Sequence, residues 1–153
     1  MADAAFAPHD HSACKTSGLA RAETLCAARK VRLTPVRRKA LEILFESHEA
    51  MGAYDVLAKL DAAGFGDKPP VAYRALGFLI EQGLAHKIER LNAYVACAHS
   101  GEEHHPAFLI CRSCKHVAEA ELQGQIVGPK GFVIESEVVE ALGLCPACQE
   151  AAE

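Results

Sequence analysis

Two C-x2-C motifs constrain this chain more than any other feature. Cys111 and Cys114 form the first motif, and Cys145 and Cys148 form the second, thirty residues later. Each motif can direct two thiolates toward one point, and two motifs complete a tetrahedron around zinc at Zn–S distances of about 2.3 Å. Because four thiolates leave no coordination position open, the pattern predicts a structural zinc site and not a catalytic one. A redox-active motif of the thioredoxin type needs only one C-x2-C, at the start of a helix.

The composition indicates an intracellular protein of one ordinary domain or two small ones. Seven cysteines among 153 residues are better explained in a reducing compartment by metal or redox chemistry than by disulfides. The chain has no apolar run of about 18 residues and no secretory signal, so we expect a cytoplasmic protein with no membrane partner. It also shows no nucleophile–base pair and no open metal triad. The H-x-E motif of the zinc deaminases is absent, so we do not expect an enzyme.

The net charge of −4 hides a division along the chain. Residues 1–96 carry thirteen Lys and Arg against eleven Asp and Glu, whereas residues 97–153 carry three against nine. Eight of the basic residues fall between Lys15 and Lys39, where Glu23 is the one acidic residue. Such a segment suits a surface that faces a polyanion such as DNA, although a solvated helix face explains the charge equally well.

The first 97 residues have the element order of a winged helix-turn-helix domain. Thr34-Pro35 is a strong helix start, with threonine as the N-cap and proline at the first helical position. We expect helices over 17–30, from Pro35 onward, over 53–63 and over 71–82, and then a hairpin over 86–97 that turns at Leu91-Asn92. The last helix carries an outward Tyr and Arg, as a recognition helix does. The predicted division is a flexible tail over 1–16 and a DNA-binding domain over 17–97.

A polar stretch over 98–107, which contains Pro106, predicts a hinge to a second domain over 108–150. Strands are predicted over 108–111, 116–122 and 131–139, with a short helical piece over 123–127. This small α/β domain is too thin to bury a large core alone, so we expect it to need the metal and a partner subunit. The predicted fold class is therefore α+β, a winged-helix domain followed by a small dimerisation domain with a four-cysteine zinc site.

A second metal site is predicted at the base of the hairpin. A two-residue turn at Leu91-Asn92 places His86 opposite Cys97, where opposed Cβ atoms lie about 5 Å apart. An imidazole and a thiolate at that separation can share one metal, and the pair suits zinc better than iron or manganese. His104 and His105 follow in the hinge and Glu119 lies just beyond the first C-x2-C motif. Each of these residues alone would be ordinary on a protein surface.

These residues resemble the ferric-uptake-regulator family, and within it the zinc-uptake-regulator branch. The resemblance covers about residues 17–149 and is carried by YRAL (73–76), LIEQG (79–83), HKIE (86–89), YV-C (94–97), CRSC (111–114) and LCPAC (144–148). It implies a homodimeric, metal-activated repressor whose winged helices bind palindromic operator DNA. It implies two zinc ions per chain, one structural and one regulatory.

The resemblance also implies roles for individual residues. In the zinc branch the regulatory site would fall on His86, Cys97, His104 and Glu119, with His105 an alternative to His104. The DNA-contacting positions would fall on Tyr54, Tyr73 and Arg74, with Arg37 and Arg38 as phosphate partners.

Three features depart from the family pattern. Val71 stands where the family often has Thr, and Lys115 stands where it usually has Gly. The stretch between the two motifs is also short, so we expect a shortened dimerisation helix near 123–127.

Two alternative functions are weighed against the zinc-responsive repressor. The first is a repressor of the same family that senses iron, manganese or peroxide, which Cys97 disfavours because harder metals prefer His and carboxylate ligands. The second is a redox switch in which the zinc thiolates release metal on oxidation.

Overall fold

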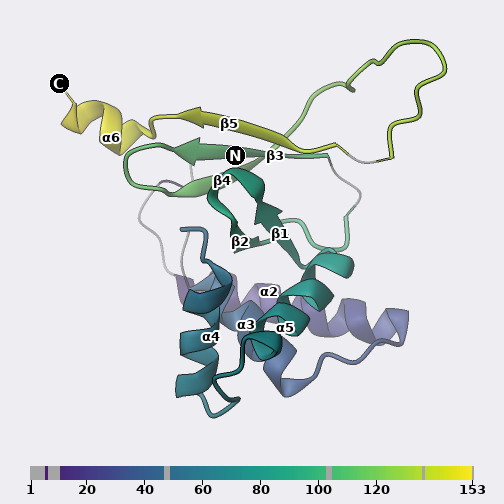
Figure 1. The fold of residues 1–153 in the computed structure, drawn as a ribbon, viewed down its shortest axis with the longest axis vertical. Coiled ribbons are helices and arrows are strands. Elements are labelled where there is room, and N and C mark those ends of the chain that lie inside the picture. Colours follow the sequence, from purple (N-terminus) through teal and green to yellow (C-terminus); the bar gives the residue numbers. More distant parts are fainter. Residues whose placement is uncertain (1–5, 7–10, 47–48, 103–104, 136, 153) are drawn as a thin grey trace.

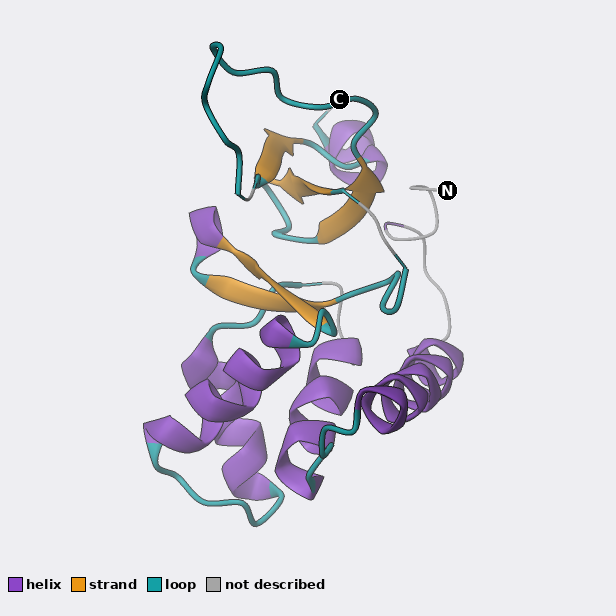
Figure 2. Cartoon of the chain, turned by 90° about the vertical axis from the view of Figure 1, so that its right-hand side faces the viewer, coloured by secondary structure: helices purple, strands orange, loops and turns teal. Residues whose placement is uncertain are grey.

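The computed structural model describes residues 6, 11–46, 49–102, 105–135 and 137–152. A helical N-terminal half is followed by a two-stranded hairpin and then by a three-stranded sheet (Figure 1). Seen from the side, the hairpin lies between the helices and the sheet (Figure 2). This arrangement confirms the predicted α+β class.

The first long helix, α2, covers His11–Arg29 and begins earlier than the predicted start at residue 17. Its first turns are held by two contacts that the sequence pattern does not reveal. The Thr16 hydroxyl donates to the Ser12 carbonyl at 2.9 Å, and Lys15 Nζ lies 3.0 Å from Glu42 Oε1 on the next helix. The predicted boundary was wrong because it relied on apolar periodicity, which begins only at Leu19, while ion pairing extends the helix toward the N-terminus.

Three further helices form the core of the N-terminal half. They are α3 (Pro35–Phe45), α4 (Ala53–Ala62) and α5 (Pro69–Glu81), close to the predicted ranges. The helix start at Thr34 is confirmed, since its side chain accepts from the Arg37 N–H at 3.5 Å. Their inward faces bury one apolar cluster, which includes Leu41, Ile43, Val56, Leu60, Ala72, Leu76 and Leu79.

The hairpin consists of β1 (Ala85–Ile88), the 3-10 turn η1 (Glu89–Leu91) and β2 (Ala93–Ala96). The predicted register was wrong by two residues: His86 pairs with Val95, and the Cys97 N–H donates to the Leu84 carbonyl at 2.9 Å. The error arose because the turn is longer than two residues, with Asn92 in the left-handed region at φ 47°. A shift of two residues keeps every side chain on its face, so His86 and Cys97 still share one side of the hairpin.

The C-terminal sheet has β3 (Pro106–Cys111) at its centre. The antiparallel β4 (Val117–Glu121) lies on one side and the parallel β5 (Val139–Gly143) on the other, and α6 (Pro146–Ala151) follows. The first two predicted strands are confirmed, but the helix at 123–127 and the strand at 131–139 are wrong. Within the described part of 122–138 the chain forms no helix or strand, and it projects as a long arm (Figure 1).

The hairpin packs on the C-terminal sheet through a second, smaller apolar cluster. Its buried members are Ile88, Phe108, Ile110 and Val117, joined by the half-buried Ala50, Leu91 and Val95. The segment after α3 adds backbone pairing, since Glu49 bridges to His116 and Met51 bridges to Tyr94. Within the described residues no helix is long and apolar enough to cross a membrane.

Candidate metal centres and DNA-facing surface

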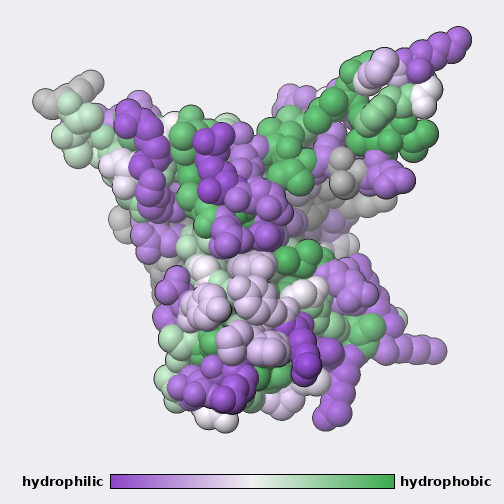
Figure 3. Space-filling view, viewed as in Figure 1, coloured by the Kyte–Doolittle hydropathy of each residue, from purple (hydrophilic) through white to green (hydrophobic). Residues whose placement is uncertain are grey.

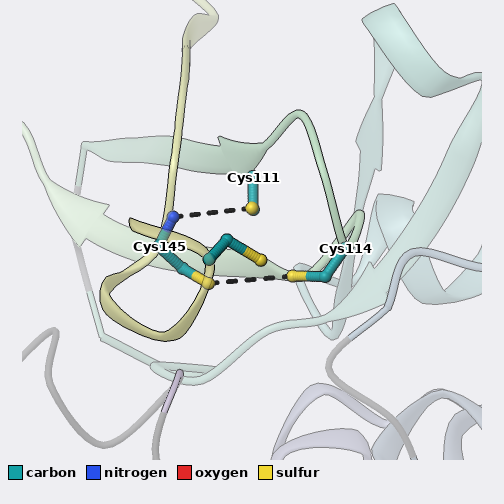
Figure 4. Close-up of side chains that lie close together, drawn as sticks. Cys111, Cys114 and Cys145 are labelled. Carbon is teal, nitrogen blue, oxygen red and sulfur yellow. Dashed lines mark hydrogen bonds between the residues drawn. The ribbon is translucent and has the colours of Figure 1, made fainter. Parts of the chain in front are cut away.

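The four cysteines of the C-x2-C motifs converge, as the sequence predicts, and we call them the four-cysteine cluster (Figure 4). Cys111 ends β3, Cys114 lies in the turn before β4, and Cys145 and Cys148 lie at the start of α6. All four sulfurs lie within 4.8 Å of one another, and those of Cys114 and Cys145 are 3.8 Å apart. A tetrahedron with Zn–S bonds of about 2.3 Å has sulfur–sulfur edges of about 3.8 Å. The donor set therefore fits a four-coordinate zinc ion.

The electrostatics of the four-cysteine cluster also favour a cation. Although burial opposes ionisation, N–H groups led by that of Cys145, 3.5 Å from the sulfur, lower the pKa of Cys111 to about 5. The next sulfur cannot ionise beside this one, and burial followed by its sulfur neighbours raises the pKa of Cys114 to about 12. The thiolate of Cys111 is thus favoured at neutral pH, and zinc would displace the proton of Cys114.

The turn that presents Cys114 contains a strained residue. Lys115 has φ 64°, in the left-handed region that favours glycine. Its ammonium donates to the Arg112 carbonyl at 2.9 Å, and its N–H donates to the Cys111 carbonyl at 3.0 Å. Lys115, one of the three departures from the family pattern, therefore lies at a position whose backbone conformation favours glycine.

A second group of metal-ligand side chains lies at the base of the hairpin, and we call it the wing-base cluster. It comprises His86 of β1, Cys97 just after β2, and Glu119 of β4, with ligand atoms within 4.8 Å of one another. His86 Nε2 is 3.6 Å from Glu119 Oε1, and Cys97 Sγ is 4.0 Å from the same oxygen. The side chains of His86 and Glu119 are only 18% and 6% exposed, and Cys97 is fully buried. A carboxylate, an imidazole and a thiol that face one point form a donor set that suits zinc.

Two contacts that the sequence pattern did not reveal orient these ligands. The Phe108 ring lies 5.1 Å from the His86 ring, and the Ala98 N–H donates to Glu119 Oε2 at 3.1 Å. This donor holds the carboxylate so that its other oxygen faces His86 and Cys97. Burial, and then the Glu119 carboxylate, raise the pKa of Cys97 to about 12. Cys97 is therefore a thiol at neutral pH until a metal displaces its proton.

Of the two candidate hinge ligands, His104 lies outside the described residues. His105 is turned toward the arm, since its Nδ1 lies 3.5 Å from Glu137 Oε1. Its carbonyl accepts from the Leu122 N–H at 2.9 Å, just beyond β4. His105 is thus engaged away from the wing-base cluster.

The candidate DNA-contacting side chains lie on the outer surface of α4 and α5. Tyr54 is 68% exposed and Tyr73 is 49% exposed, and Arg74 is exposed beside Tyr73. Within the described residues the Arg74 side chain makes no hydrogen bond or ion pair. This surface therefore offers a guanidinium with unused donors, together with two aromatic side chains.

Arg37 and Arg38 are held by contacts within the domain. The Arg37 guanidinium lies 3.9 Å from the Phe78 ring centroid and donates to the Arg32 carbonyl at 2.7 Å. Arg38 Nε lies 2.8 Å from Glu23 Oε1. The basic segment from Lys15 to Lys39 is therefore partly neutralised by acidic side chains of the same helices.

Comparisons with known proteins agree with this geometry, although no family model matches the chain. The zinc uptake regulation protein of Escherichia coli (strain K12) is 43% identical over 140 residues, which cover 86% of this chain and 81% of that protein. Among solved structures, a zinc uptake regulator complexed with zinc and DNA is 41% identical with a TM-score of 0.85, covering 90% of this chain and 97% of that chain.

A further solved relative, XcZur, is known in two states. Its holo form is 33% identical with a TM-score of 0.75, covering 88% of this chain and 98% of that chain. Its apo form is 32% identical with a TM-score of 0.52, covering 88% and 97%. The arrangement of the present chain is thus closer to the holo form than to the apo form.

Proposed function

Because the chain belongs to the zinc-uptake-regulator branch of the ferric-uptake-regulator family, we propose that it is a zinc-responsive transcriptional repressor of zinc-uptake genes. It binds palindromic operator DNA as a zinc-loaded homodimer in the cytoplasm. It is not an enzyme. The observation that carries the proposal is the wing-base cluster, whose ligands come from both sides of the hinge.

Each chain holds two zinc ions in this proposal. The four-cysteine cluster holds the structural ion, and the wing-base cluster holds the regulatory ion. His104 is the proposed fourth regulatory ligand, because His105 is engaged with Glu137. The soft thiolate of Cys97 favours zinc over iron or manganese as the signal.

The regulatory ion acts by fixing the hairpin against the C-terminal sheet. His86 and Cys97 belong to the winged helix, whereas Glu119 belongs to the second domain. Metal binding therefore selects one orientation of the two DNA-binding domains of the dimer. A dimer binds two half-sites well only when their separation matches the spacing of the recognition helices.

A second copy of the chain is the proposed partner of the C-terminal domain. The arm over 122–138 exposes apolar side chains, among them Phe132 at 68% and Val133 at 79% (Figure 3). Beside β5 and α6 lies an apolar groove of about 580 Å³ whose lining includes Leu142 and Leu144. Exposed apolar surface of this extent is typical of an interaction site and is rare on monomers.

The DNA-facing surface is proposed on α4 and α5. Arg74 reads a purine in the major groove, while Tyr54 and Tyr73 contact phosphate or a thymine methyl. Arg37 and Arg38 contact phosphate, with Arg37 held in place by the Phe78 ring. Exposure of the first three side chains supports this assignment.

Zinc content measured together with operator binding tests the proposal. We expect two zinc ions per chain, one of which mild chelation removes, and we expect operator binding to be lost with that ion and restored by zinc. Operator binding that persists after the labile ion is removed would contradict the regulatory role. Restoration by iron or manganese, but not by zinc, would identify a different signal.

A further inference from the structure

The hairpin is held to the C-terminal sheet at both of its ends. The wing-base cluster holds one end, about 10 Å from the tip at the usual rise of a strand. At the tip, the Glu140 carboxylate of β5 accepts two backbone N–H groups of η1. The Glu89 N–H donates to Oε1 at 2.6 Å and the Arg90 N–H donates to Oε2 at 3.2 Å. Both carboxylate oxygens are thus used, and neither contact involves a metal ligand.

The apolar cluster between these two ends cannot fix the angle of the hairpin by itself. Ile88, Phe108 and Ile110 are almost fully buried there, but apolar contact has no directional preference. Hydrogen bonds to an ionised carboxylate are directional and are stronger than bonds between neutral groups. Together with the Glu49–His116 and Met51–Tyr94 bridges, Glu140 therefore supplies the orientation that the apolar cluster leaves open.

We infer that Glu140 is a positioning residue that sets the zinc concentration at which the protein binds DNA. This inference rests on the proposed function of the wing-base cluster. The ligands of that cluster come from both domains, so they are assembled only when the hairpin lies on the sheet. Glu140 favours this arrangement without touching zinc, and so raises the fraction of zinc-free chains that can bind the ion.

The expected size of the effect follows from an equilibrium between chains whose hairpin lies on the sheet, which can bind zinc, and chains whose hairpin does not. The apparent dissociation constant of a ligand equals its intrinsic value divided by the competent fraction. Removing two charge-assisted hydrogen bonds at a half-buried site should lower that fraction about tenfold. The zinc midpoint should then rise about tenfold, while saturating zinc should still recover wild-type operator affinity.

Glu89 allows the contact to be broken from the opposite side. It is the first residue of η1, a position that tolerates proline, so Glu89→Pro removes the 2.6 Å donor and leaves Glu140 intact. Glu89→Ala keeps the N–H and loses only the exposed side chain, which pairs with Lys87 at 3.6 Å. It is therefore the matched control.

The test uses the full-length dimer with its structural zinc in place. Regulatory zinc affinity is measured by competition with a chromophoric chelator, and operator binding is measured in buffered zinc on a duplex selected with the wild-type protein. Glu140→Ala should raise both midpoints about tenfold, whereas Glu89→Pro, which leaves the Arg90 N–H bond in place, should raise them about threefold. The double variant should show no rise beyond that of Glu140→Ala, and Glu89→Ala should stay within about twofold of wild type.

An unchanged zinc midpoint in Glu140→Ala or Glu89→Pro would overturn the inference, as would additive effects in the double variant. A lower melting temperature without a midpoint shift would reduce Glu140 to a structural role. If Glu140→Ala does not fold, the zinc midpoint of Glu89→Pro decides between these outcomes. Failure of the proposed function is distinct, because there the wild-type protein itself would bind operator without its labile zinc.

Discussion

The raised pKa of Cys97 should make the proposed binding of regulatory zinc depend on pH in a defined direction. Burial, and then Glu119, raise this pKa to about 12, so the metal-free site holds a thiol throughout the neutral range. Zinc binds the thiolate, and the proton must leave when the metal enters. Affinity should therefore increase as pH rises, because a lower proton concentration favours the exchange.

The size of the effect follows from the release of one proton. While pH stays below the pKa of about 12 for Cys97, the zinc dissociation constant falls tenfold for each unit by which pH rises. Between about pH 7.5 and pH 8.5 the midpoint should thus fall about tenfold, or 1.4 kcal/mol of binding free energy. If the thiolate were already formed in the metal-free protein, the midpoint would not change over this interval.

Zinc competition against a chelator of known pH dependence measures this slope in the protein with its structural zinc in place. Calorimetry in buffers of different ionisation enthalpy counts the released protons directly, and we expect about one per regulatory zinc ion. A midpoint that moves less than twofold, or release of no protons, would refute a protonated Cys97 as ligand. Cys97→Ser should bind no regulatory zinc at either pH.

Substitutions at four further positions test the proposed sites one at a time. Cys97→Ser should abolish zinc-dependent operator binding yet leave a folded dimer with one zinc per chain, as metal analysis and size-exclusion chromatography would show; zinc-dependent binding by this variant would contradict the assignment. Cys111→Ser should release the structural zinc and unfold the C-terminal domain, which circular dichroism and proteolysis detect, because a structural zinc ion supplies folding free energy. Lys115→Gly should stabilise the protein by about 0.5–1 kcal/mol in urea unfolding by relieving the left-handed backbone, while Lys115→Ala should not. Arg74→Ala should weaken operator binding by about 1–3 kcal/mol and relax its sequence preference. Arg38→Ala, which breaks the pair with Glu23, should weaken binding to all DNA sequences alike. Equal loss of specificity in both variants would count against Arg74 as the base-reading residue.

Local signals in the sequence were enough to predict the elements whose partners lie close along the chain. Thr34-Pro35 begins α3 where predicted, because a cap and a proline act within one helical turn. The paired C-x2-C motifs converge because each turn holds its own two cysteines in reach of one point. The wing-base cluster was predicted through a wrong register, and it survived because the error of two residues kept His86 on the correct face.

The predictions from sequence failed where the partner of a segment lies far away along the chain. The alternation of side chains from Phe132 to Val139 predicts a strand, but apolar residues occur on both faces of that stretch, so the pattern does not define one buried face. No described strand pairs with residues 131–138. A strand forms only beside a neighbour that satisfies its N–H and C=O groups. Glu140 was likewise missed, because the N–H groups it accepts belong to residues fifty and fifty-one positions earlier.

The different tasks proposed for the two metal sites follow from where their ligands lie. All ligands of the four-cysteine cluster belong to the C-terminal domain, so the structural ion is held whatever the angle of the hairpin. His86 and Cys97 are separated from Glu119 by the hinge, so the free energy of regulatory zinc binding includes the cost of bringing two domains together. The same cost lowers the zinc affinity of the regulatory site and makes its ion exchangeable. It also couples zinc binding to DNA binding, since a ligand shifts the equilibrium between the open and the closed hinge only by its preference for one of these states. In the proposed mechanism zinc controls DNA binding because the labile site lies across the hinge, and Glu140 tunes the response because it reduces that cost without binding zinc.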